Sequence, residues 1–442
     1  MGNKKKFSAA QIILVGFFSV IALGTLLLCL PFSSAKGEFT SFTDAFFTAT
    51  SATCVTGLSV NVTAEYWSVF GQVVILLLIQ IGGLGFMTLI TLIVFFIRGR
   101  VGLFNRKVLM QASSIPNFGS VFKLFRYILI GTLVAEIVGA GVLAIEFVPE
   151  YGSSRGIYLA VFHAVSAFCN AGFDIIGKNS LVPYLGNPLV ILTVAVLIIV
   201  GGLGFLVWSN VLEGKFRWKK FNLHTKIVLI ATAVLIVVPT LLFLLFEWNY
   251  TLKDLSFGEK LLASFFQAVS PRTAGFYTVD QAQMSESAYV LTIVLMFIGG
   301  NSGSTAGGIK TTTLVIILFS VLAEAKKCDC IIVGKRKLPA GDAKTASAIL
   351  SIYTMMIVVS TMIICAIEPS ATLKEVLYEI VSAICTVGLS LGVTAELSVI
   401  SKLIIAVLMF VGRVGSISVV LAFGGTKKTS PVDLPTENIM IG

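Results

Sequence analysis

The sequence has little charge and almost no histidine. Of its 442 residues, 12% are Asp, Glu, Lys or Arg and only 2 are His, so the charged share is about half that of a soluble globular domain. The 7 cysteines lack metal-ligand spacing, because Cys328 and Cys330 stand closer together than a C-x-x-C pair and have no nearby His. We interpret the cysteines as packing residues and expect no resident metal and no cofactor in this chain.

Apolar residues are abundant instead. They make up 56% of the chain, and the mean hydropathy is +0.97. Runs long enough to cross a bilayer of roughly 30 Å, about 20 residues each, lie near 11–31, 69–97, 122–148, 187–213, 225–247, 288–323, 344–367 and 398–424. We predict a polytopic membrane protein with eight spans, whose first run is retained because it is longer than the core of a cleavable signal peptide.

The positive charges are distributed unevenly between the connections of these spans. Of the 32 Lys and Arg residues, 22 fall in the connections on one side and 7 on the other. Basic connections remain cytoplasmic, so we predict a plasma-membrane protein with both termini in the cytoplasm. This asymmetry accounts for the net charge of +10 without nucleic acid as a partner. The acids favour the outer side, either to keep short loops soluble or to attract cations to an outer mouth.

Shorter segments recur four times between the long runs. They read FTATSATCVTGLS (47–59), FHAVSAFCNAGFD (162–174), FFQAVSPRTAGFY (265–277) and YEIVSAICTVGLS (378–390). Each has a serine, then a small residue, glycine and Leu or Phe. The spans that follow match as well, with IGGLGF (81–86), VGGLGF (200–205), IGGNSG (298–303) and VGRVGS (411–416). The chain therefore divides into four units, 1–108, 109–214, 215–340 and 341–442, each a helix, a half-helix with its turn, and a second helix.

Half-helices of about 10–14 residues are too short to cross a membrane and predict re-entrant segments. Four of them around one axis would direct the negative ends of their dipoles at one cavity, which favours a cation. The extended backbone beyond each half-helix is tolerated only where it lines a path for water or ions. We predict an all-α integral membrane fold of four tandem helix–pore-helix–helix repeats around one pore.

These turns, together with TATSATCVTGLSV, PRTAGF and LMFIGGNSGSTAGGIK, resemble the Ktr/Trk/HKT superfamily of potassium transporters, most closely the KtrB-type membrane subunit of bacterial Ktr systems. The resemblance covers nearly the whole chain and implies a potassium-channel-like fold built from one chain. It assigns an ion filter to Val55, Thr56, Gly57, Asn170, Ala171, Gly172, Thr273, Ala274, Gly275, Thr386, Val387 and Gly388. An intact Gly57 favours potassium over sodium in this family. The resemblance further implies a homodimer on a cytoplasmic nucleotide-binding ring of the KtrA or KtrC type, with the nucleotide on the partner only, and it leaves sodium coupling open.

The stretch GGNSGSTAGGIKTTT (299–313) resembles a phosphate-binding P-loop but has one residue too many before Lys310. Its glycines and hydroxyl residues favour helix poorly, so the second span of the third unit should be broken and the loop should face a cavity. The resemblance makes this loop a gate, formed by Gly299, Gly300, Asn301, Ser302, Gly303, Ser304, Thr305, Ala306, Gly307, Gly308, Lys310 and Arg413. We expect the matching spans of the other units to be continuous.

Two side chains at membrane depth have more than one interpretation. Arg413 either bonds the carbonyls of the loop and adds a barrier to cations or pairs with a carboxylate. Glu136 lies midway along a span and has no predicted role beyond pairing with a neighbouring helix.

Two other functions compete with an ion-conducting subunit. A secondary cation symporter would have a midplane site at the broken helix, but such folds usually break two helices in corresponding places. An intramembrane enzyme is disfavoured because the sequence has no H-E-x-x-H motif and no acid pair or Ser/His set at membrane depth. We therefore predict no enzymatic activity. The basic loops at 98–107, 215–226 and 326–344 are expected to contact either the regulatory partner or anionic lipid headgroups.

Overall fold

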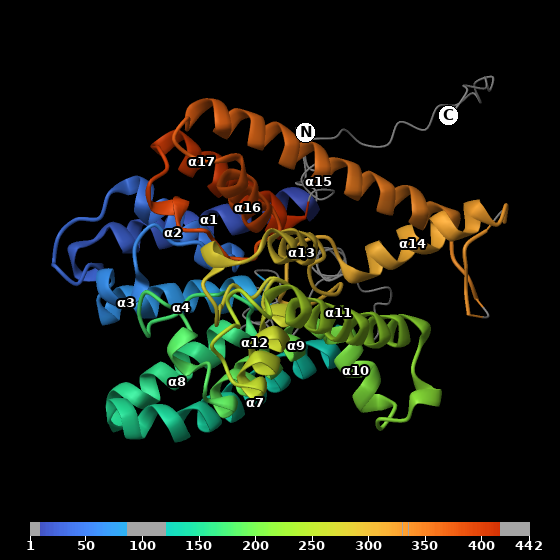
Figure 1. Cartoon of the computed structure of the whole chain (residues 1–442), viewed down its shortest axis with the longest axis horizontal. Helices are drawn as coiled ribbons and strands as arrows, with labels where there is room; N and C mark the ends of the chain where they lie inside the picture. Colours follow the sequence, from blue (N-terminus) through green and yellow to red (C-terminus); the bar gives the residue numbers. More distant parts are fainter. Residues whose placement is uncertain (1–8, 86–120, 329, 335, 416–442) are drawn as a thin grey trace, which may run out of the picture.

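The computed structural model describes residues 9–85, 121–328, 330–334 and 336–415. The chain ends, the basic loop at 98–107 and the distal parts of the spans predicted at 69–97 and 398–424 lie outside the described residues. Within them the protein is almost entirely helical, as predicted (Figure 1). In the described part of the chain, four helices are long and apolar enough to cross a membrane, α1 (Ala9–Cys29), α7 (Val121–Tyr151), α11 (Leu223–Glu247) and α15 (Ala340–Ile367). The described part thus has the composition of a membrane protein with several spans.

The long helices expose apolar side chains where a soluble protein would carry polar ones. Ile137 on α7 is 68% exposed, Leu245 on α11 is 70% exposed and Met355 on α15 is 69% exposed. Water would oppose such a surface, whereas the hydrocarbon of a bilayer accommodates it. These outward faces therefore mark the lipid-facing surface of the molecule.

Four short helices fill the interior. They are α2 (Phe42–Cys54), α8 (Ser153–Phe168), α12 (Phe257–Val269) and α16 (Leu373–Ile384). α12 and α16 begin with capping boxes, in which Ser256 pairs with Glu259 and Thr372 with Glu375, so the first free N–H groups are satisfied. α8 has 16 residues and is longer than predicted, because it starts directly after the turn at Gly152 that ends α7.

Further helices follow the short ones. They are α4 (Val69–Leu84), α9 (Pro188–Leu203), α10 (Phe205–Glu213), α13 (Glu286–Phe297), α14 (Thr311–Ala325) and α17 (Val399–Val414). Each short helix packs against a helix of the preceding segment: α8 on α4, α12 on α9, α16 on α13, and α2 on α17. The four short helices therefore follow one another around the molecule, and the last segment returns to the first.

We expected that, among the second spans of the four units, only that of the third unit is broken. This expectation is wrong. α9 and α10 meet at an angle of 90° at Gly204, which has a φ of +95°. α4 and α17 likewise end before glycines with positive φ, Gly85 and Gly415. A left-handed residue ends a helix, and glycine adopts this conformation without a steric penalty from Cβ. The final glycine of IGGLGF and VGGLGF, and Gly415 of VGRVGS, thus each end a helix.

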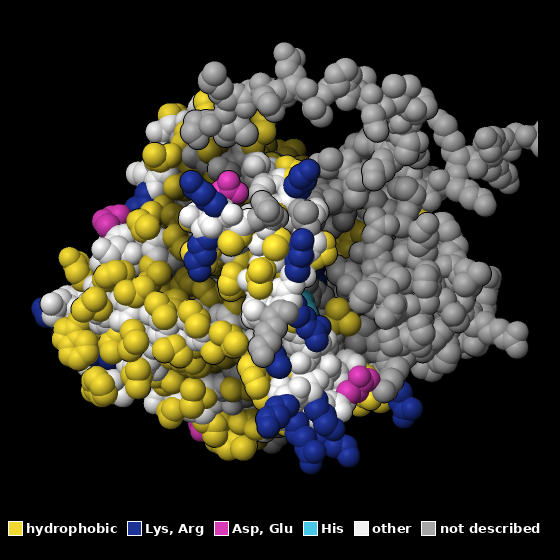
Figure 2. All heavy atoms as spheres, turned by 90° about the vertical axis from the view of Figure 1, so that its right-hand side faces the viewer, with side chains coloured by type: hydrophobic (Ala, Val, Ile, Leu, Met, Phe, Trp, Pro, Cys, Tyr) yellow, Lys and Arg dark blue, Asp and Glu magenta, His cyan; other side chains and the backbone are white. Residues whose placement is uncertain are grey.

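The remaining elements are small. They are α3 (Thr63–Tyr66), the 3-10 turns η1 (Pro31–Ser33), η3 (Val182–Tyr184), η4 (Trp218–Lys220), η5 (Gln281–Gln283) and η6 (Val393–Ala395), and a hairpin of β1 (Ile332–Val333) with β2 (Arg336–Lys337). The hairpin is antiparallel and pairs Ile332 with Lys337. It lies near α14 at the right of Figure 1, and Figure 2 shows Lys and Arg side chains gathered on this end of the molecule.

Candidate functional site

The turns that follow the short helices share one backbone pattern. In each, a residue in the left-handed region is followed two positions later by a glycine with positive φ. The first residues are Val55, Asn170, Thr273 and Thr386, with φ of 57°, 58°, 71° and 51°, and the glycines are Gly57, Gly172, Gly275 and Gly388, with φ of 94°, 70°, 79° and 95°. Left-handed backbone at side-chain-bearing residues costs on the order of 1–3 kcal/mol each and gathers at functional sites. The turns are therefore the leading candidate site.

A serine near the C-terminal end of each short helix holds the following turn in place. The backbone carbonyl of the serine accepts the N–H of the residue before the glycine; the pairs are Ser51–Thr56 at 2.8 Å, Ser166–Ala171 at 2.8 Å, Ser270–Ala274 at 2.9 Å and Ser382–Val387 at 2.8 Å. The hydroxyls divide into two kinds. Those of Ser51 and Ser382 accept the N–H of the glycine, while those of Ser166 and Ser270 donate to the carbonyl after it. The serines of the sequence pattern thus fix the turn geometry.

The four turns close into a ring. A Cβ placed on Gly57 would stand 2.5 Å from the carbonyl O of Ala171, one on Gly172 would stand 2.8 Å from that of Ala274, and one on Gly275 would stand 2.7 Å from that of Val387. A Cβ on Gly388 would collide with the carbonyl O of Thr56, which returns to the first turn. Real Cβ atoms essentially never approach another atom within 3.0 Å. The predicted filter residues therefore meet around one axis, with space only for glycine at the four contacts.

A cavity of about 500 Å³ opens on one side of this ring. All four glycines line it, together with Asp174 and Asp280. Asp174 lies in the loop after the second turn, where its carboxylate accepts the backbone N–H of Gly177 at 3.4 Å. Burial raises the pKa of Asp174 to about 6, against hydrogen bonds that lower it. This cavity, which we call the vestibule, thus carries the carboxylates of Asp174 and Asp280 beside the ring.

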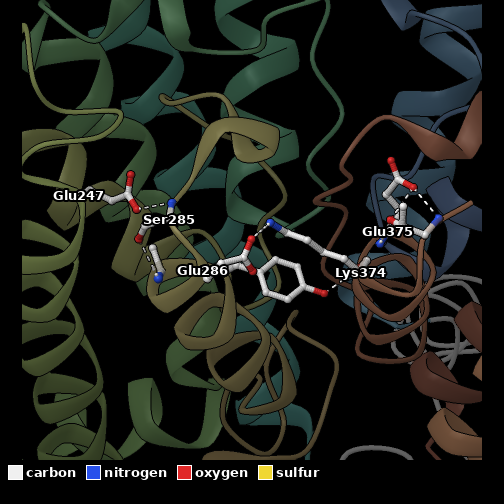
Figure 3. A network of polar contacts seen from close by, with 8 residues as sticks. Glu247, Ser285, Glu286, Lys374 and Glu375 are labelled. Carbon is white, nitrogen blue, oxygen red and sulfur yellow. Dashed lines mark hydrogen bonds and ion pairs between the residues drawn. The ribbon is translucent and has the colours of Figure 1, made fainter.

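The N-terminal end of α16 is attached to α13. Lys374 on α16 forms an ion pair with Glu286 at 2.8 Å, and the hydroxyl of Tyr289 donates to the backbone carbonyl of Lys374 at 2.7 Å (Figure 3). The exposed ion pair contributes little to stability, so the bond from Tyr289, whose ring also stacks on that of Tyr378, fixes the position of the helix. α16 in turn positions the fourth turn of the ring.

The loop at 299–310 interrupts the second span of the third unit, as predicted. Between α13 and α14 the chain folds back on itself, and Ile298 pairs with Ile309 in an isolated bridge. The N–H of Gly299 donates to the carbonyl of Ile309 at 2.9 Å, and that of Thr311 donates to Gly300 at 3.0 Å. Lys310 caps the loop, because its Nζ donates to the carbonyls of Ala306 and Gly307. The loop is a closed and internally bonded element.

The bend between α9 and α10 provides the partners of the loop. Both the backbone N–H and the side-chain amide of Asn301 donate to the carbonyl of Gly202, at 3.1 and 3.0 Å. The N–H of Phe205 donates to the carbonyl of Gly303 at 2.8 Å. The bend frees backbone groups that a continuous helix would satisfy internally, and the loop provides their partners.

Thr305 brings the loop up to the ring. Its hydroxyl lies 3.2 Å from the carbonyl of Phe168, at the end of α8, and 2.9 Å from Oδ1 of Asn170, in the second turn. Arg413 holds the same residue from the other side, since its guanidinium donates to the carbonyls of Thr305 and Gly82. It also reaches the carbonyl of Gly83 at 3.2 Å. Of the two interpretations of Arg413, the carbonyl contact is the one observed, and no ion pair joins it to a carboxylate among the described residues.

Two contacts in this region, those of Arg272 and of Gly307, were not assigned from the sequence. Arg272, which replaces the cysteine of the other turns, is buried and its guanidinium lies 3.4 Å from the hydroxyl of Thr311, just after the loop. Gly307 lies so close to Thr386 that a Cβ would collide with its hydroxyl. Glu136 accepts the amide of Gln80 on α4 at 3.0 Å, the neighbouring-helix contact that was anticipated. In the sequence, only the charge of Arg272 at a position where the other turns have cysteine could have indicated its contact with Thr311.

Comparison with known proteins agrees with this architecture. A family model described as "Cation transport protein", TrkH, matches residues 4–429. The chain belongs to the TrkH/Ktr family of cation transport proteins. It is a transporter and not an enzyme.

Individual relatives and one solved structure support the assignment. "Potassium/sodium uptake protein NtpJ" of Enterococcus hirae is 42% identical, with 99% of this chain and 98% of the relative covered. "Ktr system potassium uptake protein B" of Bacillus subtilis is 41% identical, with 99% and 97% covered. The crystal structure of the potassium transporter TrkH from Vibrio parahaemolyticus superposes with a TM-score of 0.76 at 20% identity, over 96% of this chain and 86% of that one. The last similarity shows the fold.

Proposed function

We propose that this chain is the potassium-translocating subunit of a Ktr-type uptake system. The observation that carries the proposal is the closed ring of Gly57, Gly172, Gly275 and Gly388. Each glycine lies so close to the next turn that an added Cβ would collide with one of its carbonyl oxygens. Carbonyl oxygens around such an axis replace the hydration shell of a dehydrated cation. The relatives named for potassium uptake make potassium the expected substrate.

The electrostatics of the ring favour a cation. The short helices α2, α8, α12 and α16 end at the ring, so the negative ends of their dipoles point toward it. Asp174 and Asp280 add carboxylates to the vestibule in front of the ring and raise the local concentration of cations. The predicted filter triplets, from Val55–Gly57 to Thr386–Gly388, form the ion path in this proposal.

The loop at 299–310 serves as the gate. Support comes from Thr305, which bonds to the end of α8 and to Asn170 in the second turn, and from the guanidinium of Arg413 at the same residue. A cationic side chain beside the path opposes the passage of potassium. A loop bonded through a few backbone contacts can change between two arrangements without disrupting a packed core.

The proposed topology and partners follow the sequence predictions. Both termini face the cytoplasm, the four units are residues 1–108, 109–214, 215–340 and 341–442, and the chain forms a homodimer. A cytoplasmic nucleotide-binding ring of the KtrA or KtrC type controls the loop, and sodium coupling is a property for measurement. This chain itself carries no cofactor.

A secondary cation symporter is the alternative. The bend at Gly204 supports this alternative, because two helices broken in corresponding places are a feature of such folds. Both breaks, however, belong to one bonded unit, in which Asn301 and Gly303 pair with the α9–α10 corner, and not to two independent binding sites.

Reconstitution decides between the two functions. The purified chain in liposomes should carry potassium down its gradient, faster than sodium, without a second ion gradient. Flux that requires a coupled sodium or proton gradient at fixed stoichiometry would favour the symporter. A properly folded chain that moves neither cation would overturn the proposal.

A further inference from the structure

A large apolar groove lies away from the ring, between α7, α9, α10 and the start of α11. Its volume is about 870 Å³. The walls carry aliphatic side chains, among them Val138 on α7, Val196 on α9 and Leu229 on α11. Thr193, a polar residue of the lining, donates its hydroxyl to the carbonyl of Leu189 on its own helix at 2.6 Å. The groove therefore offers hydrocarbon contact and no free polar partner at that position.

The 90° bend at Gly204 creates one end of the groove. Trp208 on α10 lines the groove, and its indole N–H donates to the carbonyl of Val200 on α9 at 3.1 Å, across the corner. Its ring also packs on Phe168 and Phe205, with centroids 5.7 and 5.4 Å away. Trp208 thus joins the groove to the end of α8 and to the corner that holds the loop.

The mouth of the groove is basic. Phe216 and Phe221, in the connection between α10 and α11, line it, and Phe216 is 75% exposed. The residues next to them in the chain include Lys215, Arg217, Lys219 and Lys220, all of them exposed, with Glu213 as the one acid in residues 213–221. Figure 2 shows Lys and Arg side chains gathered on this end of the molecule. A cluster of four such residues beside the membrane attracts an anionic headgroup.

We propose that this groove binds an anionic phospholipid, with its acyl chains along α7 and α9 and its phosphate on the basic segment 215–220. The walls match hydrocarbon and the mouth matches a net negative headgroup, a combination that a zwitterionic lipid satisfies only in part. A second copy of the chain would need to bring both an apolar face and acids to the same place.

The bound lipid also braces the loop, an effect that rests on the proposed function. The corner it supports carries Gly202 and Phe205, the partners of Asn301 and Gly303. A lipid that fills the groove stabilises the bend and thereby the present arrangement of the loop. Flux in liposomes should therefore be lower with anionic lipid than with neutral lipid alone.

Lipid retention tests the site without any transport measurement. The full chain is placed in nanodiscs of phosphatidylcholine with a minor fraction of phosphatidylglycerol, and the lipids that remain bound are identified by native mass spectrometry. Phosphatidylglycerol should be retained selectively. Replacing Lys219 and Lys220 together by Gln should weaken its retention about 25-fold, since each basic residue contributes about fivefold. Lys36 and Lys253, which are exposed and lie outside the three basic loops, form the control pair, whose replacement by Gln should leave retention unchanged.

A second variant tests the apolar walls. Val196→Trp fills the groove from a position that is 54% exposed, and Val358→Trp on α15, which is 52% exposed, is its control. Only the former should displace the lipid. Equal retention of both lipids, or no effect of either Lys219/Lys220 or Val196 substitution, would overturn the site. A shift of oligomeric state by Val196→Trp with lipid retention intact would assign the groove to a second copy instead. Lost lipid without altered flux would overturn the bracing effect alone.

Discussion

At the scale of single residues, a side chain added at Gly57 tests whether the glycine ring forms the ion path. Gly57→Ser places a Cβ 2.5 Å from the carbonyl of Ala171, so this carbonyl must move and one quarter of the ring distorts. Potassium flux should fall and discrimination against sodium should weaken, as measured in liposomes with either ion. Gly37→Ser is the control, because Gly37 also has a positive φ but nothing lies within 4 Å of its Cβ position. Equal behaviour of the two variants would remove Gly57 from the ion path.

Arg413 links three segments through its guanidinium. Its charged hydrogen bonds to Thr305 and Gly82 contribute on the order of 1.5–3 kcal/mol. Arg413→Ala should release the loop and remove a positive charge, so potassium flux should rise about tenfold. Arg413→Lys keeps the positive charge but loses the paired N–H donors of the guanidinium. Its potassium flux should lie between those of the wild type and Arg413→Ala. Wild-type flux through a monodisperse Ala variant would contradict the barrier role.

In the proposed orientation, we expect Asp174 to make the vestibule sensitive to external pH. Its pKa is raised by burial to about 6, so the carboxylate is charged above that pH and neutral below it. Potassium uptake at low external potassium should therefore decline as the external pH falls through about 6. Asp174→Asn should abolish that step and lower uptake at neutral pH, whereas Asp254→Asn, outside the vestibule lining, should retain the wild-type profile. A step that persists in Asp174→Asn would assign the titration to another group.

At the scale of elements, the bend between α9 and α10 is a support of the loop. Gly204 has a φ of +95°, and its Cβ position lies 2.8 Å from the carbonyl of Ser302. Gly204→Ala should therefore strain the bend and push the loop away, which raises flux and leaves the preference for potassium unchanged. Gly152→Ala is the matched control, with a φ of +81° and open space around its Cβ position. Reduced flux through a folded Gly204→Ala variant would mean that the loop supports the path and does not obstruct it.

At the scale of the whole molecule, thiol labelling tests the proposed orientation. Cys328 is exposed at the end of α14, on the face proposed to be cytoplasmic. A membrane-impermeant maleimide should label it in inside-out vesicles and not in intact cells. Cys328→Ser serves as the blank that identifies labelling at other cysteines. Labelling of Cys328 from outside intact cells would reverse the topology and place the basic face on the wrong side for a cytoplasmic regulator.

The sequence by itself determined the local conformations. A serine on each half-helix and a glycine six positions later, or five in the third copy, set four turns of one geometry, because hydrogen bonds within a dozen residues fix them. The glycines and hydroxyl residues of 299–310 likewise cannot sustain a helix. Family membership could also be inferred from these motifs, and the family comparison confirmed it.

Only the tertiary structure decided which segments meet. The bend at Gly204 escaped prediction because VGGLGF differs little from a continuous helix in sequence, and its freed backbone groups are satisfied by a loop about 100 residues away. The same holds for Arg413, whose partner carbonyl at Gly82 lies 331 positions earlier. Contacts of this separation depend on how whole helices pack around the axis, and no local pattern of residue types encodes that packing.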